Sequence, residues 1–139
     1  SAGQEVPAAF GVLDYGRILD RAAAKGMGAF VIRVLAAGAL TADPSKGGGG
    51  SGQTLSPGSD YASDLQRAEK VKTALDVQGK DLTQAAIRFG LMNQNVSAVL
   101  VGFSNTTHVD EAVACSGAPK LSEQEMAKLR SLWQMDFGN

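Results

Sequence analysis

Only two segments of this chain have the character of β-strands, and this limits the folds open to it. Residues 29–35 and 96–101 are short runs rich in β-branched and other apolar side chains. Neither run alternates clearly between polar and apolar residues, which favours strands buried on both faces, as in a parallel sheet. Two parallel strands alone leave their outer edges unpaired and make a poor sheet. We therefore expect both strands to belong to a larger sheet or barrel.

Helical periodicity is visible in most of the remaining sequence. Apolar residues recur at helical spacing in residues 15–25, 60–76, 82–92 and 105–115, and in a last segment from residue 122 onward. Asp14 suits the N-cap of the first helix, and Gly26 suits the C′ position after it. Ser122, with Glu125 three residues later, is the sequence pattern of a capping box. This order of elements predicts an α/β fold with about two parallel strands and five helices.

The length of the chain predicts a single domain, which the strand count makes a partial one over residues 1–139. Residues 1–13 mix Gly, Pro and isolated apolar residues and are expected to form a loop that leads into the first helix. Residues 41–59 are a flexible Gly/Ser-rich insertion, whose centre at residues 47–52 reads GGGGSG. A natural loop and an engineered linker both fit this composition. A phosphate-binding loop does not, because the Gly-Lys-Ser/Thr ending is missing.

The composition excludes several classes of function. Thirteen Lys and Arg against fourteen Asp and Glu give a net charge of −1, which argues against nucleic-acid or membrane-surface partners. The single cysteine, Cys115, excludes an internal disulfide, and the single histidine, His108, excludes a multi-histidine metal site. The sequence contains no membrane-spanning apolar run and no signal peptide pattern. A cytoplasmic location without a metal is therefore expected.

The junction between the second strand and the next helix is the strongest candidate for chemistry. The strand ends at Gly102, and Ser104 and Asn105 then supply a hydroxyl and an amide at the start of a helix. Free N–H groups and a partial positive charge make such a helix terminus suitable for a phosphate. A purely structural role for Ser104 or Asn105 as the N-cap fits the spacing equally well. His108 in the first turn is by itself more typical of a solvated residue than of a ligand.

The same junction carries a family resemblance. Residues 99–111, which read VLVGFSNTTHVDE, resemble the last strand and the following helix of the aldo-keto reductases. Residues 82–91, LTQAAIRFGL, are similar to the preceding helix of that family, and residues 31–41, VIRVLAAGALT, to its seventh strand and the turn after it. Residues 121–129, LSEQEMAKL, resemble its closing helix. The four matches come in family order and extend from about residue 14 to residue 133.

The resemblance implies a (β/α)8 TIM barrel that transfers a hydride between NADPH and a carbonyl group. This chain would form the C-terminal part of the barrel, after its sixth strand. The turn after strand seven touches the cofactor diphosphate in that family, and the matching residues here are Arg33, Leu35 and Gly38. The loop and helix after strand eight hold the adenosine 2′-phosphate and the adenine. The matching residues are Gly102, Phe103, Ser104, Asn105, His108 and Glu111.

Two departures from the family pattern bear on function. Many members carry Lys or Arg in the segment after strand eight, where this chain has Gly102 and His108. A neutral histidine is a weaker partner for a 2′-phosphate, so the choice between NADP and NAD stays open. The catalytic tetrad of Asp, Tyr, Lys and His lies on the first four strands of the family barrel, and no residue of this chain matches it. We therefore predict no catalytic residue here.

The sequence leaves three interpretations of the whole chain. In the first, it is the NADP-binding, C-terminal part of an aldo-keto reductase, is inactive alone, and needs the missing barrel half from elsewhere. In the second, it is a non-catalytic module that forms homo-oligomers, exchanges strands or docks onto another protein through its strand edges and the amphipathic helix at residues 121–133. In the third, it is the poorly folded product of a broken reading frame.

Overall fold

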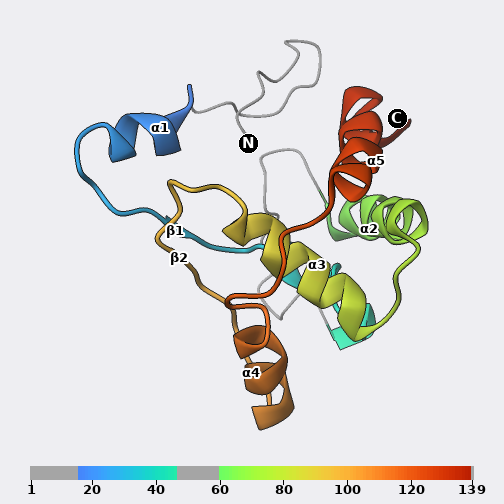
Figure 1. The fold of residues 1–139 in the computed structure, drawn as a ribbon. Helices are drawn as coiled ribbons and strands as arrows, with labels where there is room; N and C mark the ends of the chain where they lie inside the picture. The colour runs from blue at the N-terminus through green and yellow to red at the C-terminus, as the bar shows by residue number, and fades with distance from the viewer. Residues whose placement is uncertain (1–15, 47–59, 139) are drawn as a thin grey trace.

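The computed structural model describes residues 16–46 and 60–138 (Figure 1). Within these ranges, helices and strands follow one another in the predicted order. The elements are α1 (Ile18–Ala23), β1 (Phe30–Val31), α2 (Tyr61–Leu75), α3 (Lys80–Leu91), β2 (Ala98–Val99), α4 (Thr106–Val113) and α5 (Glu123–Gln134), with short 3-10 helices η2 (Ala36–Gly38), η3 (Pro44–Lys46) and η4 (Asp136–Gly138). The predicted lead-in at residues 1–13, the N-cap at Asp14 and most of the predicted insertion, residues 47–59, lie outside the described residues.

The two strands pair in parallel, as predicted, but are much shorter than predicted. Phe30 aligns with Ala98, and Val31 aligns with Val99. The Leu100 N–H donates to the Val31 carbonyl over 2.8 Å, which extends the ladder by one hydrogen bond. The predictions of strands over residues 29–35 and 96–101 were too long. The backbone turns into the left-handed region at Arg33 (φ 61°), so β1 cannot remain extended to residue 35.

Helix α3 covers one face of this strand pair. Gly90 permits the close approach, because a Cβ at this position would lie 3.0 Å from Val34 Cγ1 and 3.2 Å from Val99 Cγ2. Successive side chains of a strand point to opposite faces, so the aligned pair Val31 and Val99 faces α3. Both valines are half-buried.

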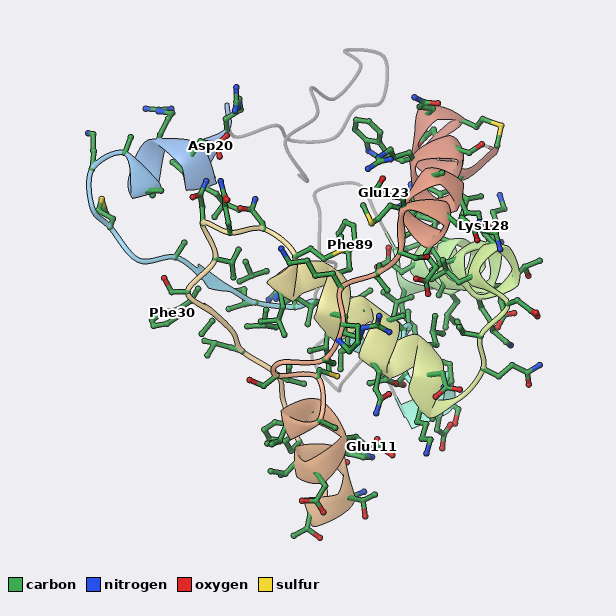
Figure 2. All side chains as sticks on the ribbon, viewed as in Figure 1. Asp20, Phe30, Phe89, Glu111, Glu123 and Lys128 are labelled. Atoms are coloured by element: carbon green, nitrogen blue, oxygen red, sulfur yellow. The ribbon has the colours of Figure 1, made fainter. Side chains whose placement is uncertain are left out.

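The other face of the strand pair is open to solvent. Phe30 and Ile32 from the β1 segment are 70% and 60% exposed, and Leu100, which follows β2, is 53% exposed. Phe30 lies on the side of the strands away from α3 (Figure 2). These three residues, which we call the open apolar face, have no helix over them among the described residues.

The main core lies between helices, away from the strands. Leu75 of α2, Ala85 of α3, Leu121 and Met126 form one buried cluster. Helix α5 lies beside α2 (Figure 1), and the two helices pack together. Leu121 and Met126 are 4% and 5% exposed, so the apolar side of residues 121–133 is used inside the fold. Part of the apolar side that the second interpretation assigned to docking is therefore occupied within the fold.

Side-chain caps fix the starts of α2 and α5. The Asp60 carboxylate accepts from the Ser63 N–H over 2.8 Å and caps α2, and this bond lowers the pKa of Asp60. The predicted capping box is present, because Ser122 Oγ accepts from the Glu125 N–H and Glu125 accepts from the Ser122 N–H over 2.6 Å. That backbone N–H lowers the pKa of Glu125. Helix starts at α2 and α5 were thus predictable from sequence.

Helix α1 differs from its prediction in length. It covers six residues instead of residues 15–25, and its N-cap, Arg17, is left-handed with no side-chain cap. It ends at Ala23, two residues before the predicted end, and the glycine predicted to follow the helix closes its last turn. Gly26 (φ 70°) occupies the C′ position of a Schellman motif, since its N–H donates to the Ala23 carbonyl and the Met27 N–H donates to the Ala22 carbonyl.

Replacing Gly90 tests the contact between α3 and the strands. We expect Gly90→Val to lower the free energy of unfolding by about 1–3 kcal/mol, because the new methyl groups would overlap Val34 and Val99. Urea unfolding followed by circular dichroism measures the change. Ala127→Val, at an exposed position of α5, controls for the cost of a β-branched residue in a helix. Equal effects of the two substitutions would contradict the contact.

Candidate functional site

The residues predicted to bind a cofactor lie in two segments that start from the same edge of the strand pair. Because β1 and β2 are parallel, both carboxyl ends point the same way, and the hydrogen bond from Leu100 to Val31 keeps them together. In Figure 1 the chain after β1 passes behind α3, and the chain after β2 continues to α4. The parallel pairing therefore brings the starts of both segments to one edge.

The segment after β1 has an unusual backbone. Arg33 (φ 61°), Ala36 (φ 48°), Ala37 (φ 54°) and Gly38 (φ 103°) all have positive φ angles. A residue with a side chain in a sparsely populated backbone region costs about 1–3 kcal/mol and persists only where its surroundings hold it. Such residues cluster at functional sites. This strain, which has no signal in an alanine-rich sequence, was missed by the sequence analysis.

Hydrogen bonds and burial hold this strained turn. The Gly38 N–H donates to the Leu35 carbonyl over 2.9 Å, and the Thr41 hydroxyl donates to the Gly38 carbonyl over 2.6 Å. Ala39, directly after η2, is 1% exposed and anchors the turn. Of the predicted site residues here, Arg33 is exposed, whereas Leu35 and Gly38 are half-buried. The turn therefore presents an exposed cationic side chain on a backbone held by hydrogen bonds.

The segment after β2 leads directly into α4. Gly102 and Phe103 are exposed, and nothing in the described chain lies within 4 Å of where a Cβ of Gly102 would be. Asn105 is the N-cap, because its Oδ1 accepts from the His108 N–H over 3.0 Å. The structural interpretation that the sequence left open thus holds for Asn105. It does not hold for Ser104, which precedes the cap.

Ser104, Asn105 and His108 form one hydrogen-bonded cluster. Ser104 Oγ lies 3.1 Å from His108 Nδ1, and Asn105 Nδ2 lies 3.2 Å from His108 Nε2. The capping bond fixes the Asn105 amide oxygen, so its NH2 group faces the imidazole and Nε2 must accept. A neutral ring then carries its proton on Nδ1 and donates to Ser104. The Ser104 hydroxyl proton is left to donate to another group.

The cluster and the helix start together supply donors that suit a phosphate. Thr106 and Thr107 are the first two residues of α4. Their N–H groups have no acceptor within the helix, because the first N–H groups of any α-helix lack an intrahelical partner. No acidic residue lies in this first turn, so the partial positive charge of the helix terminus is not offset there. Both threonines directly follow the N-cap residue Asn105, so the sequence alone could have identified their N–H groups as candidate phosphate donors.

The remaining predicted residue and the cysteine lie further along α4. Glu111 is half-buried, one turn beyond His108, and Figure 2 shows it on the side of α4. Cys115 follows the helix and is 3% exposed, and burial raises the pKa of its thiol. His108, in the first turn of the helix, is exposed.

These residues fit a nicotinamide dinucleotide phosphate in type but with little charge. The donors after β2 are neutral hydroxyl and N–H groups, and residues 100–111 contain no Lys or Arg. Arg33, from the segment after β1, is the one Lys or Arg among the predicted site residues. Arg33 and the donors after β2 are exposed, so a phosphate could reach either of them without displacing a buried side chain.

Other kinds of site are not found in the described ranges. No group of three or more His, Cys, Asp or Glu side chains there is arranged to hold a metal ion. None of the helices described is long and apolar enough to cross a bilayer. An open groove of about 640 Å³ lies on α2 and reaches Leu132 of α5, and it contains none of the predicted site residues.

Comparison with known proteins bears directly on the resemblance. The model of the Aldo/keto reductase family matches residues 12–134. No individual curated protein matches the chain significantly. The family match covers both strands, all five helices of the described ranges and every predicted site residue. The chain therefore belongs to the aldo/keto reductase family.

Proposed function

We propose that this chain is the cofactor-holding, C-terminal part of an NADP-dependent aldo/keto reductase, built as part of a (β/α)8 barrel. Family membership supports the reaction class, which is an oxidoreductase acting on carbonyl groups. The observation that carries the proposal is the common edge from which both candidate segments start. Active sites of such barrels lie at the carboxyl ends of the strands.

The described residues suggest a division of roles. Arg33 would bind the diphosphate, with Leu35 and Gly38 holding the strained turn that carries it. The Ser104 hydroxyl and the first N–H groups of α4 would bind the 2′-phosphate. The adenosine surface would be formed by Gly102, Phe103, Asn105, His108 and Glu111. When bound, the nicotinamide supplies the hydride, and these residues bind and orient it.

The proposal also covers location and catalysis. One buried cysteine in a family of reductases is consistent with a reducing, cytoplasmic environment. No residue of this chain is assigned a catalytic role, because none matches the tetrad of the family. The chain is proposed to need further strands, with the tetrad on them, to reduce a carbonyl group.

Loss of Arg33 should weaken cofactor binding selectively. Titration calorimetry is the suitable method, because Trp133 lies on α5 beside α2 and would report poorly on α4. We expect NADPH to bind the chain and Arg33→Ala to raise Kd about tenfold, the loss of one charge-assisted hydrogen bond. Lys128→Ala removes an equal charge from the exposed surface of α5 (Figure 2) and should leave Kd unchanged.

Two comparisons sharpen this titration. Repeating it with NADH measures the contribution of the 2′-phosphate, and raising the salt concentration should weaken NADPH binding because the contacts are exposed. A folded chain with no heat of binding for either dinucleotide would refute the proposal. Equal increases of the NADPH Kd in Arg33→Ala and Lys128→Ala would show that the diphosphate does not bind at the turn after β1.

The chain alone should not reduce carbonyl compounds. We expect the rate of NADPH consumption, followed by its absorbance, to equal the blank rate with a panel of aldehydes and ketones, because no proton donor is assigned to this chain. Adding the first six strand–helix units of a family member as a separate polypeptide should give turnover if the two parts assemble. Turnover by the chain alone would overturn the assignment of catalysis to other strands.

The open apolar face favours a second candidate function. Phe30, Ile32 and Leu100 are each more than half exposed on one side of the strand pair. Contiguous exposed apolar residues of this kind mark interaction surfaces. A non-catalytic module that binds a second copy or a complementary barrel part through this face would use the same fold without the cofactor.

Sedimentation velocity distinguishes this second candidate. It predicts that the chain associates with rising concentration and that Phe30→Ser with Ile32→Ser reduces the association. Val113→Ser is the matched control, because Val113 is 64% exposed but lies on α4, away from the strand pair. A monomer at all concentrations would count against self-association through the open apolar face.

A further inference from the structure

Helix α4 depends on other elements for its position. It has eight residues, and none of them is buried. A helix of this length is not stable alone in water. Its attachment to the fold is therefore made at its two ends and through its packing against α3.

Helix α3 holds the strand that leads into α4. The close contact of Gly90 with Val99 fixes α3 against β2, from which the chain continues to Asn105. This contact governs the N-terminal side of α4. The C-terminal side of α4 is held by other contacts.

Arg88, on the same helix, holds the C-terminal side. Its Nε donates to the Pro119 carbonyl over 2.7 Å, and its Nη2 donates to the Lys120 carbonyl over 3.1 Å. Both carbonyls belong to the connector between α4 and α5, which is residues 114–122. The planar guanidinium fixes the two acceptors relative to each other, which a lysine ammonium cannot do.

The connector is fixed at both of its own ends. Cys115, directly after α4, is 3% exposed, and its Sγ lies 3.4 Å from the Glu111 carbonyl and 3.9 Å from the Gln84 carbonyl of α3. Leu121 belongs to the main core. Between these two anchors, residues 116–120 have no buried side chain. Arg88 bonds the connector within this stretch and so links α3 to the segment that follows α4.

We propose that Arg88 is a positioning residue for the candidate cofactor site: its two hydrogen bonds to the connector hold α4 so that Ser104, Asn105 and His108 stay in place at the carboxyl edge of the strand pair. Its effect on NADPH rests on the proposed function. Arg88 itself does not contact the cofactor in this scheme. Its role is to fix the helix whose first turn does.

Hydrogen exchange and calorimetry on the same variants test this role. We expect Arg88→Ala to speed amide exchange in α4 about tenfold while the amides of α2 and α5 keep their wild-type rates, and to raise the NADPH Kd about tenfold. Arg88→Lys keeps the charge but loses the fork, so it should recover less than half of either effect. Arg130→Ala, on α5 beside Glu123, is the control and should change neither measurement.

The outcomes separate this inference from the proposed function. Unchanged exchange in α4, or equal acceleration in α2, α4 and α5, would overturn the positioning role. Faster exchange confined to α4 with an unchanged NADPH Kd would overturn its link to the cofactor. If the wild-type chain binds no NADPH, the proposed function fails, and exchange in α4 still decides whether Arg88 positions this helix. Should Arg88→Ala not fold cooperatively, Arg88→Lys carries the test.

Discussion

The parallel pairing of β1 with β2, supported by the approach of α3 at Gly90, is the constraint on which the candidate site depends. The pairing is only two residues long on each strand, yet it sets which way both following segments leave the sheet. Because Gly90 has no side chain, α3 can lie close against Val34 and Val99. The strained turn after β1 and the helix start after β2 would then have no common edge.

Sequence reasoning succeeded where the signal is local. The cap at Ser122 and the C′ glycine Gly26 each depend on residues within one helical turn, and the structure confirms them. The order of elements follows from the same short-range patterns. The family resemblance added the candidate site residues, and parallel pairing brings the starts of their two segments together.

Sequence reasoning failed where partners are distant. Strand length depends on a neighbour and on where the backbone leaves the extended region, and the positive φ of Arg33 and Ala36 has no signature in those residue types. The helix at residues 121–133 was predicted to be a docking surface because its apolar side can be seen in the sequence. Its packing partner within the fold, α2, cannot. The contact of Arg88 with Pro119 spans 31 residues, and no local pattern indicates it.

The separation of the core from the strands has a thermodynamic consequence. The core cluster contains residues of α2, α3 and α5 and its preceding residue Leu121, and no residue of β1 or β2. The helical part can thus stay folded while the strand edge opens, since local opening follows the distribution of buried contacts. A ligand bound at that edge would close it, adding about 2.7 kcal/mol at a concentration 100 times its Kd. In that case the dinucleotide would act as a structural part of the domain as well as a reactant.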